Sequence, residues 1–332
     1  MKLMVTGGAG FIGSNFVHHR LETRPDDEIV ILDKMTYAGR SENLEGLPPD
    51  RFRLVEADIA DRDAVRSALE GCDALINFAA ESHVDRSIES PGEFITTDVF
   101  GTFVLLEAAR DARIRHLQIS TDEVYGSIDE GSFTEESPIE PSSPYSASKA
   151  GGDLIVRAFN HTYGADALVI RASNNYGPRQ HPEKLIPLTI LNALHGDPIP
   201  VYGNGMQVRN WLFVRDFCTA IETVLESGEA GTVYNAGGPD ELPNIDVVKT
   251  ILRLAGADES LITHVDDRLG HDVRYSLASA RTEALGWRPA VSFDEGIERT
   301  VAWYRDNPEW WRAIREGDYR EYYERQYGKE LG

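Results

Sequence analysis

Short apolar runs alternate with helical segments along the first half of the chain. Strands are predicted at residues 2–6, 29–33, 52–57, 74–78, 116–120 and 167–172. Continuous apolar strands separated by helices are typical of a parallel sheet that helices cover on both faces. The pattern therefore predicts an α/β fold with a doubly wound parallel sheet.

The helices between these strands have recognisable ends. Asp61 is a candidate N-cap for a helix that runs to about residue 69, and Gly71 can close it. Pro91 and Gly92 precede a long helix that reaches about residue 110, and Pro144 opens another.

The alternation changes after residue 172, where proline and glycine interrupt the chain more often. Helices are predicted at residues 185–194, after 216, at 245–255 and at 293–305, and strands at 199–202, 208–214 and 232–236. The change predicts two domains: residues 1–172, to which later segments return, and a smaller C-terminal domain that consists mainly of residues 173–332.

Composition limits the classes of protein. With 332 residues, 41% of them hydrophobic, the chain can bury a core, but it has no apolar run long enough for a membrane helix. The first predicted strand begins at residue 2, so a cleaved signal peptide would remove structure, and we expect a soluble, cytoplasmic protein. Two isolated cysteines, Cys72 and Cys218, and scattered histidines predict neither a disulfide scaffold nor a metal site.

The net charge of −22 argues against a nucleic-acid partner, because phosphate backbones are bound by basic surfaces. An anionic ligand would have to be bound by a few individually placed arginines.

A glycine-rich turn follows the first predicted strand. The run from Gly7 to Gly13 reads G-G-A-G-F-I-G and lies between a strand and a helix. Glycines there let the backbone approach a pyrophosphate, whose charge is stabilised at the helix N-terminus. Asp33 ends the second strand, where a carboxylate can bind a ribose diol and repel a 2′-phosphate. We therefore expect NAD rather than NADP, although the adjacent Lys34 is the one feature that favours NADP.

Tyr145 and Lys149 are four residues apart on a predicted helix and so share one face. A phenol ordinarily titrates near pH 10, so a base that works near pH 7 needs about 4 kcal/mol of preferential phenolate stabilisation. A neighbouring ammonium and a positive nicotinamide can supply it. The pair predicts oxidation or reduction at an alcohol.

Thr121, Asp122 and Glu123 follow the strand at residues 116–120. Consecutive strand residues point to opposite faces, so both carboxylates can serve one substrate only if the chain bends there. Such a bend is expected, because ligands bind at the carboxyl ends of these strands. Alcohol oxidation alone gives no function to two carboxylates, so the pair predicts a further step, the loss of water.

At these residues the chain resembles the extended short-chain dehydrogenase/reductase family and, within it, the dTDP-glucose 4,6-dehydratases. The similar stretches are residues 7–13, 33–39, 79–87, 120–126, 144–149, 173–178, 182–187, 209–212 and 267–272. The Thr-Asp-Glu triplet is the discriminating one, because related epimerases and decarboxylases keep the Tyr-Lys pair and usually lack the two acids.

The resemblance implies a homodimer with a Rossmann domain that retains NAD, a C-terminal portion that binds a nucleotide sugar, and a role in deoxysugar biosynthesis. It implies as catalytic residues Thr121, Asp122, Glu123, Tyr145 and Lys149. The implied cofactor site adds Gly7, Gly10, Phe11, Ile12, Gly13, Asp33, Lys34, Thr36, Asp58, Ile59, Phe78, Ala79, Ala80, Ser82, Thr97 and Asn175. Substrate contacts are implied for Ser82, Thr121, Asn174, Lys184, Leu185, Pro200, Val201, Tyr202, Arg209, Asn244, Arg268 and His271.

The predicted reaction oxidises the 4-hydroxyl of dTDP-glucose, removes water across C5 and C6, and returns the hydride to C6. Arg179, Asn210 and Leu269 depart from the family pattern and leave the preference for dTDP over UDP open. A UDP-sugar 4-epimerase or decarboxylase, and a catalytically silent NAD-binding regulator, stay as alternatives.

Overall fold

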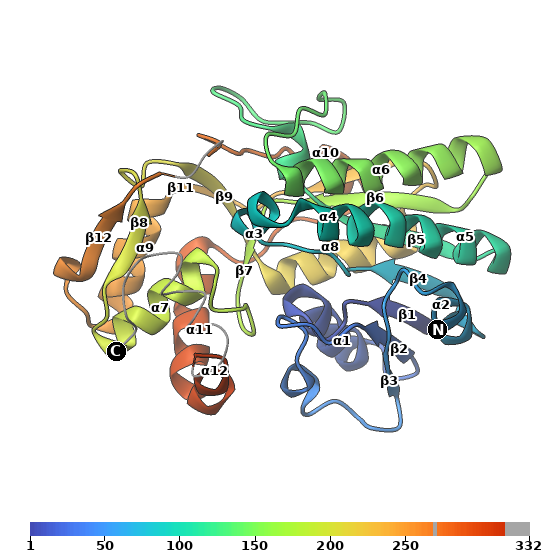
Figure 1. Cartoon of the computed structure of the whole chain (residues 1–332), viewed down its shortest axis with the longest axis horizontal. Helices are drawn as coiled ribbons and strands as arrows, with labels where there is room; N and C mark the ends of the chain where they lie inside the picture. The colour runs from blue at the N-terminus through green and yellow to red at the C-terminus, as the bar shows by residue number, and fades with distance from the viewer. Residues whose placement is uncertain (268–270, 316–332) are drawn as a thin grey trace.

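The computed structural model describes residues 1–267 and 271–315. Its centre is a seven-stranded parallel sheet in the order β10-β6-β5-β4-β1-β2-β3 (Figure 1). The strands are β1 (Lys2–Thr6), β2 (Glu28–Asp33), β3 (Phe52–Glu56), β4 (Ala74–Asn77), β5 (Arg115–Thr121), β6 (Ala167–Ala172) and β10 (Val233–Ala236). The predicted doubly wound α/β fold is confirmed.

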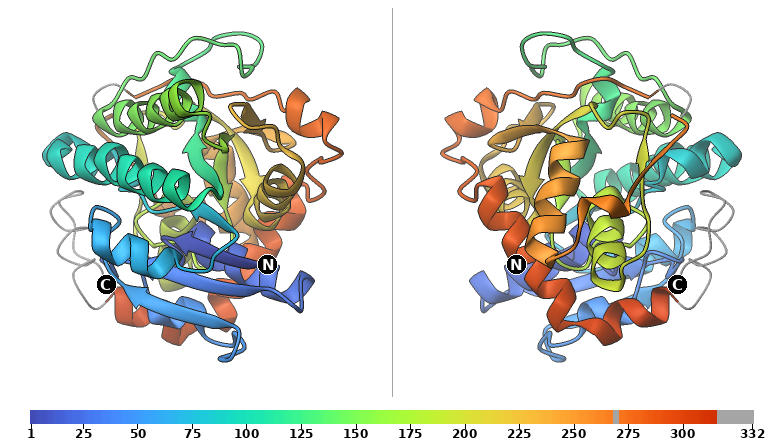
Figure 2. Two further views of the ribbon diagram at one scale, coloured as in Figure 1. Left: turned by 90° about the vertical axis from the view of Figure 1, so that its right-hand side faces the viewer. Right: turned by 90° about the vertical axis from the view of Figure 1, so that its left-hand side faces the viewer.

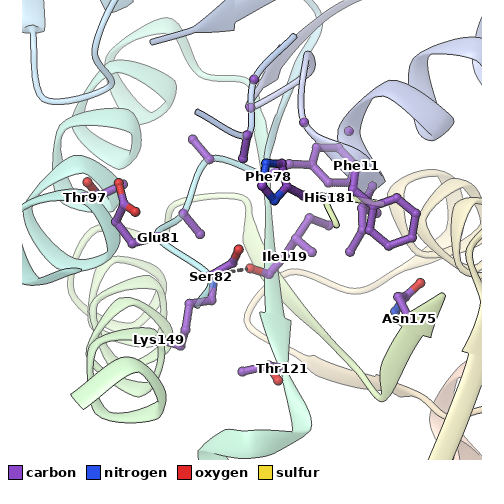
Figure 3. A pocket seen from close by; sticks show the side chains of 18 of the residues that line it. Phe11, Phe78, Glu81, Ser82, Thr97, Ile119, Thr121, Lys149, Asn175 and His181 are labelled. Atoms are coloured by element: carbon purple, nitrogen blue, oxygen red, sulfur yellow. Dashed lines mark hydrogen bonds between the residues drawn. The ribbon is translucent and has the colours of Figure 1, made fainter. Parts of the chain in front are cut away.

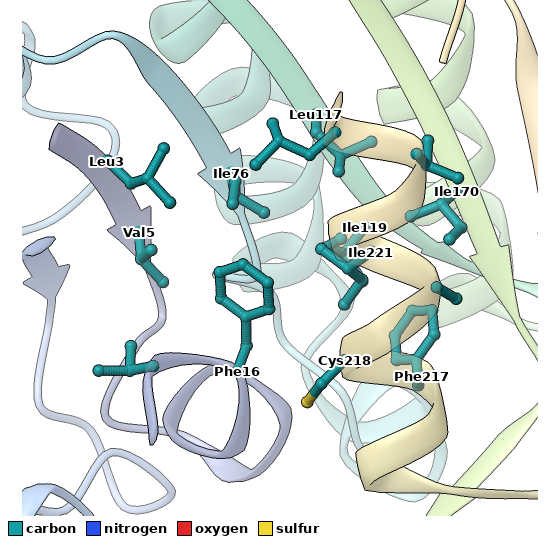
Figure 4. Close-up of a cluster of buried hydrophobic side chains, with 14 of the residues drawn as sticks. Leu3, Val5, Phe16, Ile76, Leu117, Ile119, Ile170, Phe217, Cys218 and Ile221 are labelled. Carbon is teal, nitrogen blue, oxygen red and sulfur yellow. The ribbon is translucent and has the colours of Figure 1, made fainter. Parts of the chain in front are cut away.

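Alternate side chains of the strands enter two hydrophobic layers, one on each face of the sheet. Leu3 and Val5 of β1 join the layer beneath α1 (Phe11–Thr23) and α8 (Val214–Ser227), which Figure 4 shows with Phe16 and Phe217. Met4 points to the opposite layer, covered by α2 (Arg62–Leu69) and α5 (Thr102–Ala112). Burial on both faces explains why the strands read as continuous apolar runs.

The helix predicted at residues 92–110 is interrupted. It consists of α4 (Pro91–Phe94), a π-helical segment η2 (Ile95–Gly101) and α5. It packs against α6 (Pro144–Tyr163), where a Cβ on Gly152 would lie 2.8 Å from the Asp98 carbonyl oxygen. Figure 2 shows α5 and α6, in teal and green, side by side on one flank.

The remaining elements form two small sheets and a second helical layer, at the left of Figure 1. The sheets contain β7 (Asn174–Tyr176), β9 (Val208–Phe213) and β11 (Asp240–Pro243), and β8 (Ile199–Tyr202) with β12 (Ile262–Val265). The helices are α7 (Leu185–His195), α9 (Asn244–Ala255), α11 (Phe293–Asp306) and α12 (Pro308–Arg315). The predicted helices and strands of this half are present, whereas β7, β11 and β12 are too short for the pattern to reveal.

Short elements complete the described chain: η1 (Ser41–Leu44), α3 (Val84–Glu89), η3 (Asp122–Tyr125), η4 (Glu259–Leu261) and α10 (Ala280–Ala284). Two segments beyond residue 172 return to the large sheet and its helices: β10 pairs with β6, and α8 packs beside α1. The domain boundary at residue 172 stays a prediction.

In the part of the chain that the structure describes, no helix combines the length and the hydropathy that crossing a membrane requires. The cytoplasmic location stays a prediction.

Candidate active site

A cavity of about 310 Å³ opens at the carboxyl ends of the central strands (Figure 3). It lies where the sheet order reverses between β1 and β4, the usual position of a ligand in a doubly wound sheet. Every residue of the predicted cofactor site lines this cavity, as do the five predicted catalytic residues. We call it the first cavity.

The glycine turn leaves no room for larger side chains. Gly7 has a φ of +65°, and a Cβ there would lie 2.6 Å from the Ala79 backbone nitrogen. A Cβ on Gly13 would lie 2.3 Å from the Gly7 carbonyl oxygen. The first turn of α1 has no side-chain cap, so its N–H groups face the end of the cavity where an anion would be stabilised. This cradle fits a pyrophosphate.

Asp33 ends β2 in the cavity wall. Its Oδ2 accepts a hydrogen bond from the Ala9 N–H and its Oδ1 accepts one from the Met35 N–H, both at 2.9 Å. Burial raises the pKa of this carboxyl, and the two backbone bonds oppose the rise. Lys34 forms an ion pair with Asp58 at 2.8 Å, so the one residue that favoured a 2′-phosphate already has a carboxylate partner.

The chain bends at the end of β5, as two cooperating carboxylates require. Thr121 Oγ1 accepts a hydrogen bond from the Glu123 N–H at 3.2 Å and donates one to Asp122 Oδ1 at 3.3 Å. The one-turn helix η3 begins there and turns both Asp122 and Glu123 to the first cavity. The predicted bend is confirmed.

Asp122 is buried and protonated near neutral pH. Burial and then the negative charge of Glu123 raise the pKa of this carboxyl to about 8, against the opposing effects of Arg209 and Thr121. Its Oδ2 has no hydrogen-bond partner in the described structure. Asp122 can therefore donate a proton into the cavity.

Tyr145 and Lys149 lie one turn apart on α6, which a capping box at Ser143 starts. Lys149 Nζ donates to the Ile119 carbonyl oxygen at 2.9 Å (Figure 3). Burial and then the charges of Glu123 and Asp98 raise the pKa of the Tyr145 phenol well above its ordinary value. The surrounding side chains thus keep the phenol protonated, and a positive charge from outside the chain is needed to make it a base.

A second cavity of about 170 Å³ adjoins the first. Predicted substrate residues that line it are Asn174, Lys184, Leu185, Pro200, Val201, Tyr202, Arg209, Asn244 and His271. Ser82 and Thr121 line the first cavity instead, and Arg268 lies outside the described residues. Both cavities share Glu123, Asn174, Asn175, Gln180, Glu183 and Lys184, so they form one continuous site.

The second cavity has polar groups that suit a polar ligand. Asn174 Oδ1, Asn244 Oδ1 and Trp211 Nε1 are buried and have no hydrogen-bond partner in the described structure. The Arg209 guanidinium lies 4.3 Å from the centre of the Tyr275 ring and donates to the Asp272 carbonyl oxygen at 2.9 Å. A buried arginine fixed in this way provides positive charge at a defined position.

Two residues that depart from the family pattern lie outside both cavities. Asn210 binds Gly238 through both amide atoms, at 2.9 and 2.8 Å, and Arg179 adopts a positive φ in a loop. Neither lines either cavity. Leu269 is outside the described residues.

Sequence reasoning missed several lining residues. His181 and Glu183 line the first cavity, and Glu183 lies in one of the stretches that carry the family resemblance. Ser173 lines it because it follows β6, which the rule on carboxyl strand ends could have revealed. Trp211 lies in the stretch 209–212 that carries the family resemblance, whereas Tyr275 reaches the second cavity through tertiary packing that no local pattern indicates.

Comparisons with known proteins agree with this geometry. A family model described as GDP-mannose 4,6 dehydratase matches residues 4–300. The low-salt glycan biosynthesis protein Agl12 of Haloferax volcanii is 51% identical over 311 residues, which are 93% of this chain and 100% of that protein. The dTDP-glucose 4,6-dehydratase of Streptomyces niveus is 50% identical over 326 residues, covering 96% and 97% of the two chains.

Solved structures extend the likeness to three dimensions. DesIV of Streptomyces venezuelae, a dTDP-glucose 4,6-dehydratase solved with NAD and dTDP bound, is 52% identical with a TM-score of 0.92, covering 95% and 100% of the two chains. The UDP-glucose 4-epimerase of Thermus thermophilus, solved with NAD, is 31% identical with a TM-score of 0.85, covering 92% and 100%.

Proposed function

The chain belongs to the GDP-mannose 4,6-dehydratase family, and from that premise we propose that it converts dTDP-glucose to dTDP-4-keto-6-deoxyglucose and water. One observation carries the proposal: a protonated Asp122 and the adjacent Glu123 line the same cavity as Tyr145 and Lys149. An epimerase needs only Tyr145 and Lys149. The resemblance to dTDP-glucose 4,6-dehydratases is confirmed by relatives about half identical over nearly the whole chain.

NAD is the proposed resident cofactor. The glycine cradle around Gly7 and Gly13 fits its pyrophosphate, and the Asp33 carboxylate suits a ribose diol. When bound, NAD supplies the redox chemistry, because it accepts a hydride from C4 of the sugar and later returns it to C6. Its positive ring also supplies the charge that the Tyr145 phenol lacks.

The side chains of the first cavity perform the proton transfers. Tyr145, oriented by Thr121 and supported by Lys149, takes the proton of the 4-hydroxyl as C4 is oxidised. The resulting 4-ketone acidifies the C5 proton, which Glu123 removes as general base. Asp122 donates its proton to the departing 6-hydroxyl, so water leaves and a C5–C6 double bond forms. Glu123 returns its proton to C5 as C6 receives the hydride, and the proton that Tyr145 took passes through solvent to Asp122, so all three groups regain their starting states.

The second cavity is proposed to bind the nucleotide. Lys184, Leu185 and the β8 residues Pro200–Tyr202 surround the proposed base subsite, and Arg209 and Asn244 lie where a diphosphate needs donors. Because the two cavities are continuous at Asn174 and Glu123, a nucleotide there places its sugar beside the catalytic groups.

A homodimer is part of the proposal. Ile95 and Phe100 of η2 and Leu154 and Tyr163 of α6 are large hydrophobic residues that are 43–57% exposed on the flank formed by these helices. An apolar flank of two helices fits a second copy of itself. Light scattering should show a dimer that Leu154→Arg converts to a monomer; a dimer that survives this change contradicts the proposed interface.

The activity is tested by mass spectrometry and NMR of the products that purified protein forms from dTDP-glucose, UDP-glucose or a UDP-sugar acid without added NAD. We expect dTDP-glucose to lose the mass of one water. An unchanged mass with isomerisation at C4 would indicate an epimerase. Loss of carbon dioxide from a UDP-sugar acid would indicate a decarboxylase. The absence of any reaction with these nucleotide sugars would indicate a silent binder. Each of these results contradicts the proposal.

A further inference from the structure

Three loops around the cavities are joined by one set of contacts. Tyr37 follows β2, Arg86 lies on α3, and Glu183 precedes α7. Tyr37 Oη donates to Glu183 Oε1 at 3.2 Å, and Arg86 Nε forms an ion pair with Glu183 Oε2 at 3.3 Å. The Arg86 guanidinium also lies 4.0 Å from the centre of the Tyr37 ring. We call Tyr37, Arg86 and Glu183 the loop clasp.

Glu183 is the centre of the loop clasp. Its side chain is 1% exposed, and although burial opposes ionisation, the neighbouring basic groups of His83, His181, Lys184 and Arg86 hold its pKa below the ordinary value. A buried carboxylate is stable only with such partners, so each contact of Glu183 supports the others.

Two neighbouring side chains contact the Tyr37 ring. The Arg86 guanidinium lies over it, and the His181 ring meets it edge-on with 5.3 Å between ring centres. The Tyr37 hydroxyl supplies the only polar atom of the side chain, and it is bound to Glu183. These contacts fix the whole loop that carries Tyr37.

The loop clasp closes the wall of the first cavity. Residues on both sides of Tyr37, Thr36 and Ala38, line that cavity, as do His181 and Glu183. The first two come from the loop next to Asp33, and the others come from the opposite loop. Separating these loops requires breaking the contacts of Glu183.

We propose that the loop clasp retains the cofactor, with Tyr37, Arg86 and Glu183 as positioning residues that keep the two loops closed around NAD between turnovers. The inference rests on the proposed function, because that reaction restores NAD at the end of each cycle and needs no exchange with solvent. Closed loops slow dissociation without contributing to the chemical steps.

The test uses Tyr37→Phe and Glu183→Gln, with Asp197→Asn as the matched control. Asp197 forms a buried ion pair with Arg315, and neither residue lines either cavity, so the control also removes a buried carboxylate charge opposite an arginine. Each protein is purified without NAD, and the nucleotide that it carries is released by denaturation and quantified. The rate of NAD loss is then followed by trapping released NAD with a second NAD-consuming enzyme.

We expect wild type and Asp197→Asn to retain NAD, and the two clasp variants to lose it at least about tenfold faster. Saturating NAD should restore most of the turnover of Tyr37→Phe. Unchanged NAD loss in Tyr37→Phe, or equal loss in Asp197→Asn, overturns the loop clasp alone. Tyr37→Phe decides the matter if Glu183→Gln does not fold, since it removes a single hydroxyl. A wild-type chain that carries no NAD and gains no thermal stability from added NAD overturns the proposed cofactor, and the clasp with it.

Discussion

The negative charge of Glu123 helps to keep the proton on its neighbour Asp122. Burial and that charge together raise the pKa of Asp122 to about 8, while the bend at Thr121 directs both groups to one cavity. A protonated Asp122 is suited to a general acid, and the adjacent Glu123 carboxylate lines the same cavity, where it can act as a general base.

Glu123→Gln separates oxidation from the loss of water. Tyr145 and Lys149 are intact, so the absorbance of reduced nicotinamide should still appear when substrate is added. Water loss should fall by about 10²-fold or more, because no base removes the C5 proton. If mass spectrometry shows normal dehydration by this variant, Glu123 is not the base.

Asp122 predicts an alkaline limit of the dehydration rate. The proton that it donates is present below its pKa of about 8 and is lost above it, so the rate should fall as the pH rises through that value. Asp122→Asn should be slower by about 10²-fold or more and should lack this limb. A wild-type rate that stays level well above pH 8 would contradict the assignment.

The same group links stability to pH. Because its folded pKa lies above the ordinary value of 3.8, the folded state binds the Asp122 proton more tightly than the unfolded state, and this contribution to stability is lost as the pH rises from about 4 to about 8. Asp122→Asn has no such loss. As the pH rises through this window, the free energy of unfolding in urea should increase for Asp122→Asn relative to wild type by up to about 1 kcal/mol per pH unit. A constant difference would show that Asp122 is ionised in the folded protein.

Tyr145→Phe should abolish the first step. Without the phenol no group takes the 4-hydroxyl proton, so reduced nicotinamide should form about 10²-fold to 10⁴-fold more slowly. Nucleotide binding, measured calorimetrically with dTDP, should change little, since the proposed nucleotide subsite is in the second cavity. Rapid cofactor reduction in this variant would exclude Tyr145 as the base.

Gly7→Ala tests the cofactor cradle against Gly46→Ala as its control. Both glycines have a positive φ, but a Cβ at Gly7 meets the Ala79 backbone whereas a Cβ at Gly46 meets nothing within 4 Å. Gly46→Ala should lose about 1 kcal/mol of stability from backbone strain alone, whereas Gly7→Ala should lose more because its Cβ also meets the Ala79 backbone. Only Gly7→Ala should lose bound NAD. Equal NAD content in the two purified variants would contradict the cradle.

Local chemistry predicted most of the fold and the reactive residues. The strands of the large sheet are apolar because both of their faces are buried, and the glycine turn, Asp33 and the Tyr145–Lys149 pair have spacings that chemistry requires. The predicted bend at Thr121 followed from the need to bring two carboxylates to one substrate. The π-helical segment at residues 95–101 packs closely against Gly152 of α6, and no local pattern predicts it.

The rest of the site depends on contacts between distant segments. Tyr37 and Glu183 are 146 positions apart, and although both lie in stretches that resemble the family, neither local sequence indicates that the two side chains meet. Tyr275 reaches the second cavity for the same reason. The raised pKa of Tyr145 likewise results from its burial beside Glu123 and Asp98. The helical spacing of Tyr145 and Lys149 does not predict that burial.

The central claim is that one hydride moves from C4 to C6 of the same sugar. It is tested most directly with dTDP-glucose that carries deuterium on C4, by locating the label in the product with NMR and mass spectrometry. We predict that the deuterium appears on C6. Label that remains on C4, or that is lost to solvent while water is eliminated, would contradict the account.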